Sequence, residues 1–236
     1  MQTQTSIISR RRWPLATLVI AVAVLAIFAG GETVQSLLQY DAAAIRSGQW
    51  WRLLTQHLTH WDSSHLFWDT LAFLVLGTAC ELRNRARFLA CLALSAPAIS
   101  LVLLGNLPWL HLCRGLSGLD SALFAVVVWQ IAVADTRKDE AKPDIRRVLV
   151  AGLAALLFVG KCLYEQWTGA MLFVNNAPDG PVVVYLAHLA GFACGLAVAV
   201  VPHFKGLGRR VRGCGRPRPL CRAGAGGWEA GCGGKW

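Results

Sequence analysis

The sequence has too few charged residues for a soluble domain. Asp, Glu, Lys and Arg make up 15% of its 236 residues, whereas 55% are hydrophobic; soluble domains are about 25% charged and roughly 45–50% apolar. A run of about 17–25 apolar residues can cross the hydrocarbon core of a bilayer. Runs of this kind lie at 14–30, 65–81, 87–105, 115–135, 147–165 and 181–202. We therefore expect an all-α polytopic membrane protein with six transmembrane helices.

Lys and Arg are scarce in every second loop between these runs. The loops after the first, third and fifth runs hold only Arg46 and Arg52, then Arg114, then none in 175–180. The other loops and both ends of the chain are rich in Lys and Arg. Because these residues accumulate on the cytoplasmic side, the alternation predicts that both termini are cytoplasmic.

The first apolar run has no clear cleavage site of small residues after it, so we expect it to be retained rather than removed as a signal peptide. This predicts three parts of the chain. Residues 1–12 form a cytoplasmic segment, 13–203 form the six-helix membrane domain, and 204–236 form a basic Gly-, Arg- and Cys-rich tail.

The tail also lacks the features of a folded or metal-binding segment. Residues 203–236 carry eight Lys or Arg and one Glu, which places +7 of the net charge of +10 there. Their ten glycines and weak apolar periodicity predict disorder. No close cysteine pair of the CxxC kind occurs, so we expect no metal or redox site. A basic segment here is attracted to anionic lipid headgroups, and we expect no nucleic-acid partner.

Two polar residues inside the apolar runs can carry chemistry. Ser117 begins the fourth run in Gly-Leu-Ser-Gly, and His188 lies in the sixth run. Ionisable groups in membrane segments are costly and indicate function by default. A hydroxyl with an imidazole base is a nucleophile pair for peptide hydrolysis. At about 1.5 Å per residue, Ser117 lies roughly 20 Å from the polar Gln130 and His188 roughly 21 Å from Pro202, so we expect them at similar depth. Ending the fourth run at Asp135 instead adds about 7.5 Å, which helix tilt would have to absorb.

Glycines flank both positions and predict close helix packing. Gly115 and Gly118 lie beside Ser117, and Gly191 and Gly195 follow His188. Small residues allow helix backbones to approach closely, as a serine–histidine hydrogen bond of about 2.6–3.2 Å requires. Each feature alone has a structural explanation, such as a packing motif or a histidine bonded to a carbonyl. Their occurrence together, in this order, favours an intramembrane serine protease.

The pattern resembles the rhomboid family of intramembrane serine proteases over residues 13–203. The signatures are Trp51-Arg52, His60, His65 with Asp69 four residues later, Gly77 with Glu81, the 115–118 motif, and His188 with Gly191 and Gly195. The resemblance implies that Ser117 is the nucleophile and His188 the general base, with no cofactor and no metal ion.

The resemblance also assigns supporting roles. His65, the side chain of Asp69 and the backbone N–H of Ser117 would form the oxyanion hole, supported by His60 and Gly118. Structural roles fall to Trp51, Arg52, Glu81, Gly191 and Gly195, with the Trp51-Arg52 loop partly in the membrane interface.

The compact core is similar to the rhombosortase branch of that family. This resemblance implies membrane-anchored protein substrates whose C-terminal tails carry a Gly-Gly motif, an apolar helix and a basic cluster. Cleavage would occur near the outer membrane face. The family resemblance further implies a multi-pass protein of the bacterial inner membrane, with the lipid bilayer and a membrane-anchored substrate as its partners.

Two positions depart from the family pattern. Asp69 replaces the usual Asn, and an ionised carboxylate repels an oxyanion; a protonated Asp69 could donate a hydrogen bond, and otherwise the side chain could turn toward His60 or His65. Ser121 replaces an aromatic residue that stacks on the catalytic histidine in many members. Its neighbour Asp120 shares a helix face with Ser117, so we hypothesise that Asp120 orients His188. A polar partner within the packing is the alternative.

Other functions remain as alternatives. A rhomboid-like protein without catalytic activity could bind membrane clients, although the presence of both Ser117 and His188 argues against it. A small proton-coupled transporter could use the buried His and Asp residues, but no inverted repeat is apparent. A zinc site at His57, His60 and His65 is not expected, because these residues fall on different faces of a loop and a helix.

Overall fold

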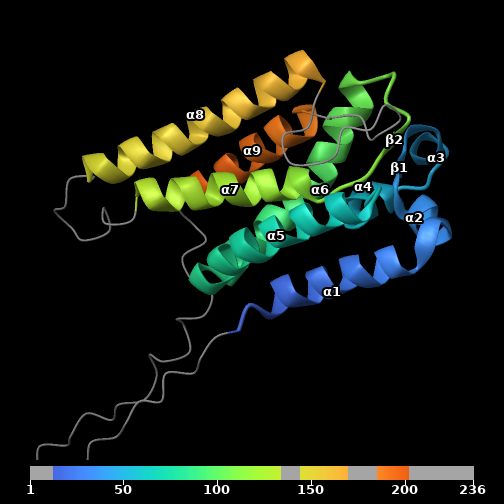
Figure 1. Ribbon diagram of the computed structural model, residues 1–236, viewed down its shortest axis with the longest axis horizontal. Helices are drawn as coiled ribbons and strands as arrows, with labels where there is room; N and C mark the ends of the chain where they lie inside the picture. The colour runs from blue at the N-terminus through green and yellow to red at the C-terminus, as the bar shows by residue number, and fades with distance from the viewer. Residues whose placement is uncertain (1–12, 134–143, 170–184, 202–236) are drawn as a thin grey trace, which may run out of the picture. The chain divides into compact units, whose positions relative to one another are not determined.

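Six long helices occupy the positions of the six apolar runs. The computed structural model describes residues 13–133, 144–169 and 185–201. Its long helices are α1 (Leu15–Ala29), α5 (Ser63–Arg83), α6 (Arg85–Asn106), α7 (Ser117–Ala132), α8 (Ile145–Thr168) and α9 (Tyr185–Val200). Figure 1 shows α1, α5, α7 and α8 running side by side, with α9 next to α7. The segments predicted at 1–12 and 204–236, and the loop at 175–180, lie outside the described residues.

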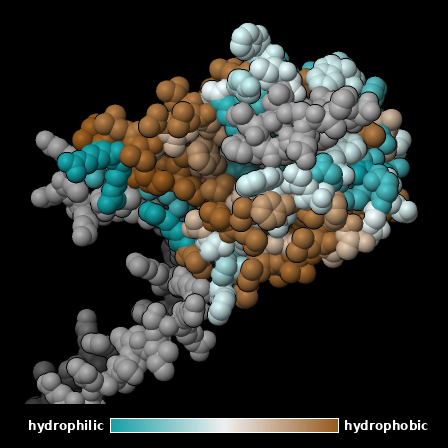
Figure 2. Space-filling model, in the orientation of Figure 1, coloured by the Kyte–Doolittle hydropathy of each residue, from teal (hydrophilic) through white to brown (hydrophobic). Residues whose placement is uncertain are grey.

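The long helices differ in their capacity to cross a bilayer. Helices α5, α6 and α8 are long and apolar enough to do so, whereas α1, α7 and α9 are shorter apolar helices. Large apolar side chains are exposed along α8, including Leu149, Leu153, Leu156 and Leu157. Figure 2 shows this hydrophobic surface over α8. Extended apolar surface of this kind is typical of a face that contacts membrane or protein.

The segment between α1 and α5 is more structured than the sequence predicts. It contains α2 (Gly31–Leu38), β1 (Tyr40–Asp41), α3 (Ala42–Arg46), α4 (Arg52–Thr55) and the 3-10 helix η1 (Gln56–Leu58). Strand β1 pairs antiparallel with β2 (Leu112–Cys113), so that Tyr40 faces Cys113. The structure therefore has more elements than the six helices expected from the apolar runs, because hydropathy carries no signal for elements this short.

Arg52 holds this segment together. Its buried guanidinium donates hydrogen bonds of 2.8 Å to the backbone carbonyls of Ser36 and Gln39 and to the side-chain oxygen of Gln49. A buried charge is tolerated when several acceptors surround it. The neighbouring Trp51 is half exposed. Arg52 thus joins α4 to the segment after α1, while the structural role of the Trp51-Arg52 pair stays a prediction.

Glu81 fastens α1 to α5. Its carboxylate accepts hydrogen bonds from the backbone N–H groups of Ala16 and Thr17, at 3.1 and 2.8 Å, and from the Thr17 hydroxyl at 2.8 Å. Those N–H groups lie in the first turn of α1, where a helix has no internal acceptors for them. Gly77 allows the close approach, because a Cβ there would lie 2.9 Å from Thr17 Cγ2.

Polar caps set where the helices that carry the site begin. Asp62 precedes α5, and its side chain accepts a 2.9 Å hydrogen bond from the backbone N–H of His65. Asp144 caps the start of α8 in the same way. Such caps satisfy N–H groups that a helix leaves unpaired. The Asp62 cap places His65 and Asp69 on the first two turns of α5.

Candidate active site

Helices α7 and α9 pack backbone against backbone. A Cβ added to Gly191 would lie 2.0 Å from the carbonyl oxygen of Gly118, and one added to Gly195 would lie 2.0 Å from that of Ala122. No side chain fits in that space, so both positions require glycine. The close approach predicted from the glycine spacing is confirmed.

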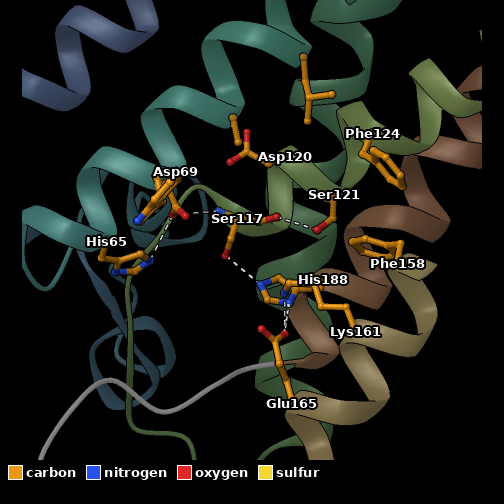
Figure 3. A pocket seen from close by; sticks show the side chains of 13 residues that line it. His65, Asp69, Ser117, Asp120, Ser121, Phe124, Phe158, Lys161, Glu165 and His188 are labelled. Carbon is orange, nitrogen blue, oxygen red and sulfur yellow. Dashed lines mark hydrogen bonds and ion pairs between the residues drawn. The ribbon is translucent and has the colours of Figure 1, made fainter. Parts of the chain in front are cut away.

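This packing brings Ser117 and His188 into hydrogen-bond contact. His188 Nε2 lies 3.0 Å from Ser117 Oγ, although the residues are 71 positions apart in the chain. Ser117 opens α7, and His188 is the fourth described residue of α9. The distance falls within the range of about 2.6–3.2 Å at which a base accepts a nucleophile's proton. The residues predicted as nucleophile and base therefore lie together (Figure 3).

Gly115 shapes the turn that leads into Ser117. Its φ angle is +133°, a conformation that side-chain-bearing residues rarely adopt. A Cβ there would also lie 2.9 Å from His65 Nε2 and 3.3 Å from Asp69 Oδ2. Glycine thus allows the 115–118 segment to pass directly against the first turns of α5.

Asp69 lies at the N-terminal end of α7 as a hydrogen-bond acceptor. Its Oδ2 accepts from the backbone N–H of Leu116 at 2.9 Å and of Ser117 at 3.2 Å. The same oxygen lies 3.2 Å from His65 Nε2 and 3.4 Å from His60 Nε2. A helix N-terminus favours a negative group at this place. Of the arrangements considered for Asp69, the structure has the side chain turned toward both histidines.

This arrangement bears on the predicted oxyanion hole. His65, Asp69 and the Ser117 N–H group do lie together, and the buried His60 backs them. Gly118 follows Ser117 on α7, and its carbonyl packs against Gly191. However, the Ser117 N–H donates to Asp69 in this structure. An oxyanion would have to share or take over that donor.

A cavity of about 430 Å³ opens beside Ser117 and His188. Residues of α5, α7, α8 and α9 line it, including His65, Asp69, Phe124, Phe158 and Lys161. Phe158 stacks on Phe192, with ring centroids 5.0 Å apart, and Phe124 lies 5.3 Å from Phe158. The cavity thus has aromatic residues along one part and the polar Ser117–His188 pair along another.

No metal-binding cluster of three or more His, Cys, Asp or Glu occurs in the described part of the chain. His57 has a backbone partner instead, since its Nε2 lies 3.0 Å from the carbonyl oxygen of Ala96. Burial lowers the pKa of this imidazole to about 4.

Comparison with known protein families shows which family has this arrangement of helices and site residues. The Rhomboid domain family matches residues 47–203, more than half of the chain. The chain belongs to the rhomboid family. The match includes every predicted site residue from Trp51 to Gly195. No curated protein matches the sequence.

Rhomboids are generally serine proteases that act on membrane proteins within the bilayer, and some members are inactive. Together with the apolar helices, family membership identifies this chain as an integral membrane protein. It agrees with an all-α membrane fold, while the number of spans and the side of each terminus remain predictions.

In this rhomboid, Asp120 does not contact His188. Within the described residues, neither oxygen of its buried carboxylate has a hydrogen-bond partner. Figure 3 shows Asp120 on the far side of Ser117 from the histidine ring. The expected orienting contact is therefore missing. Ser121 hydrogen-bonds to the Ser117 carbonyl at 2.7 Å, so its hydroxyl binds its own helix.

The acid nearest to His188 comes from α8 and was not predicted. Glu165 Oε2 lies 3.7 Å from His188 Nδ1 and 2.6 Å from Lys161 Nζ. Glu165 is 3% exposed. The sequence did offer a signal, because Lys161 and Glu165 are charged residues four apart in an apolar helix. Because the fifth apolar run ends at residue 165, Glu165 resembles the charged end of a transmembrane span in the sequence.

Proposed function

We propose that this rhomboid is an intramembrane serine endopeptidase with Ser117 as nucleophile and His188 as general base. The observation that supports this most directly is the 3.0 Å contact between Ser117 Oγ and His188 Nε2 beside a cavity. A half-buried hydroxyl–imidazole pair at this distance is what acyl transfer by serine requires. The pair needs no cofactor.

The reaction follows from the placement of these groups. His188 Nε2 takes the proton of Ser117 Oγ as that oxygen attacks a substrate peptide carbonyl. The carbonyl oxygen gains negative charge near the N-terminal end of α7, where the Ser117 N–H and the ring of His65 lie. His188 then gives its proton to the leaving amine, and water hydrolyses the acyl-enzyme.

The proposed topology follows the sequence. Six spans with both termini in the cytoplasm place the start of α7 near the outer face of a bacterial inner membrane. Cleavage would then occur near that face, in a protein anchored by its own transmembrane helix. The substrate class proposed is that of rhombosortases, namely C-terminal tails with a Gly-Gly motif outside the helix.

A second function has one observation in its favour. The Asp69 carboxylate accepts from the Ser117 N–H, which an oxyanion would otherwise use. A rhomboid-like protein that binds membrane clients without cutting them could keep that arrangement permanently. An active protease must allow Asp69 to lose its charge or its contact during the reaction.

The deciding experiment is cleavage of a tagged single-span substrate with a Gly-Gly motif outside its helix. It is co-expressed with wild-type protein, Ser117→Ala or His188→Ala, and the products are read by immunoblot. We expect cleavage by the wild type and none by either variant, since both groups carry the proton transfer. Cleavage that survives Ser117→Ala would exclude the mechanism.

Labelling with a fluorophosphonate probe separates the two candidate functions without a known substrate. The probe forms a bond between its phosphorus and Ser117 Oγ, with loss of fluoride, only when the hydroxyl is activated. Labelling of wild type but not of Ser117→Ala supports the protease. Absence of labelling in folded wild-type protein supports the client-binding function.

A further inference from the structure

His188 has a second ring nitrogen that faces an acid. Its Nε2 contacts Ser117, and its Nδ1 lies 3.7 Å from Glu165 Oε2. No hydrogen bond from another described residue reaches this Nδ1. Figure 3 shows the two contacts on opposite edges of the same ring, with Ser117 on one side and Glu165 on the other. Ser117, His188 and Glu165 therefore stand in the order of nucleophile, base and acid.

The geometry points to Glu165 as a positioning residue for His188. A neutral imidazole carries its proton on one nitrogen only. To accept the Ser117 proton at Nε2, the ring must carry its own proton on Nδ1. A carboxylate beside Nδ1 favours that tautomer, and after transfer its charge stabilises the imidazolium. The inference rests on the proposed serine protease function.

The surroundings of Glu165 fit this role. The side chain is almost fully buried, and the same Oε2 that faces His188 receives the Lys161 ammonium at 2.6 Å. A buried charge is tolerated when an opposite charge contacts it. Lys161 is a quarter exposed toward the cavity. The Lys161–Glu165 ion pair therefore places a carboxylate next to the Nδ1 edge of His188.

The distance indicates how the contact would be completed. At 3.7 Å the Nδ1–Oε2 pair is longer than a hydrogen bond, which requires about 2.7–3.2 Å. A shift of roughly 1 Å closes it. Catalytic hydrogen bonds are often longer before substrate binds than during the reaction.

The test compares Glu165→Gln with wild-type protein by the rate of fluorophosphonate labelling of Ser117. The limiting rate and the half-saturating probe concentration are measured separately. We expect the limiting rate to fall roughly 10- to 100-fold, the range of one charge-assisted hydrogen bond. The half-saturating concentration should stay the same, because Glu165 acts on the proton transfer. Glu165→Asp should recover part of the rate.

Glu81→Gln is the matched control. Glu81 is also 3% exposed and also pairs with a basic residue four positions away, Arg85, but it lies outside the cavity. The folded fraction of each variant is measured by thermal unfolding. We expect folded Glu81→Gln to label at the wild-type limiting rate.

Three results would overturn the inference. Equal limiting rates for folded Glu165→Gln and wild type would do so while leaving the protease function intact. A ¹⁵N NMR spectrum of wild-type protein with labelled histidine would overturn the inference if it showed the proton of neutral His188 on Nε2. This measurement needs no variant. Failure of folded wild-type protein to react with the probe would remove the protease function and this inference with it.

Discussion

Helices α7 and α8 both contact α9, but they do so in different ways. Helix α7 meets α9 through backbone atoms, at positions where even a methyl group has no room. Helix α8 buries only Ala151, Cys162 and Glu165, and its glycines Gly152 and Gly160 lie on its exposed surface with no atom within 4 Å of an added Cβ. The nucleophile Ser117 and the base His188 are thus placed by a backbone contact that has no room for an added side chain. The acid is placed by side chains on a helix that has room to shift.

This difference explains the two distances at His188. The Ser117–His188 contact is at hydrogen-bond length, whereas the Glu165–His188 contact is not. Interfaces formed by backbone atoms cannot adjust without separating the helices, because packed interiors have little free volume. A long side chain on a loosely packed helix can change its distance at small cost.

The largest expected effect comes from adding one methyl group at the α7–α9 contact, with an exposed glycine of α8 as the control. Gly191→Ala would drive a Cβ into the Gly118 carbonyl and separate α7 from α9, whereas Gly160→Ala meets no atom within 4 Å. A displacement of about 1 Å at a reacting pair can cost ~100-fold in rate. We expect Gly191→Ala to lose at least that much fluorophosphonate labelling and Gly160→Ala to keep the wild-type rate. Equal rates in the two variants would contradict the comparison.

An intermediate effect is expected where α7 is held by a side chain instead of a backbone contact. Asp69→Asn removes a charge from beside the Ser117 N–H and keeps a similar shape. Because a negative charge opposes the oxyanion, the labelling rate should rise about tenfold, the value of one charge-assisted interaction. Thermal unfolding should show lower stability, since His60 and His65 lose their charged partner. A fall in rate with unchanged stability would show that the carboxylate itself is required.

The smallest effect is expected from Asp120, the acid on the tightly packed helix α7. Asp120→Asn should change labelling less than about threefold, because its carboxylate makes no hydrogen bond within the described residues. Glu165→Gln on α8 should lose far more. The two variants are compared in one assay, at equal folded fraction. A loss in Asp120→Asn as large as that in Glu165→Gln would restore Asp120 as the residue that orients His188.

The sequence predicted the residues that meet through regular helix geometry. Ser117, His188 and the glycines stand out because polar or small residues in apolar runs have few structural explanations, and helical rise alone puts the first two at similar depth. All six long helices also follow from hydropathy, although α7 is shorter than the predicted run and α8 is longer.

The remaining features depend on rotation and side-chain direction, which spacing does not give. Asp120 shares a helix face with Ser117, yet its carboxylate does not reach His188. Glu165 reaches it from another helix, and no local pattern specifies which way α8 is turned. Likewise, the turn of Asp69 toward two histidines depends on the path of the 115–118 segment, which the +133° φ angle of Gly115 sets.

The Glu81 contact has a consequence for how the chain is assembled during synthesis. The first-turn N–H groups of α1 receive their acceptor from a residue 64 positions later than Thr17. Helix α1 is synthesised before α5, so its hydrogen bonds to Glu81 can form only after α5 is complete. Until then these first-turn N–H groups lack the Glu81 carboxylate as their acceptor and depend on water or another partner. A chain stopped before residue 81 therefore lacks the carboxylate that joins its first helix to the rest of the protein.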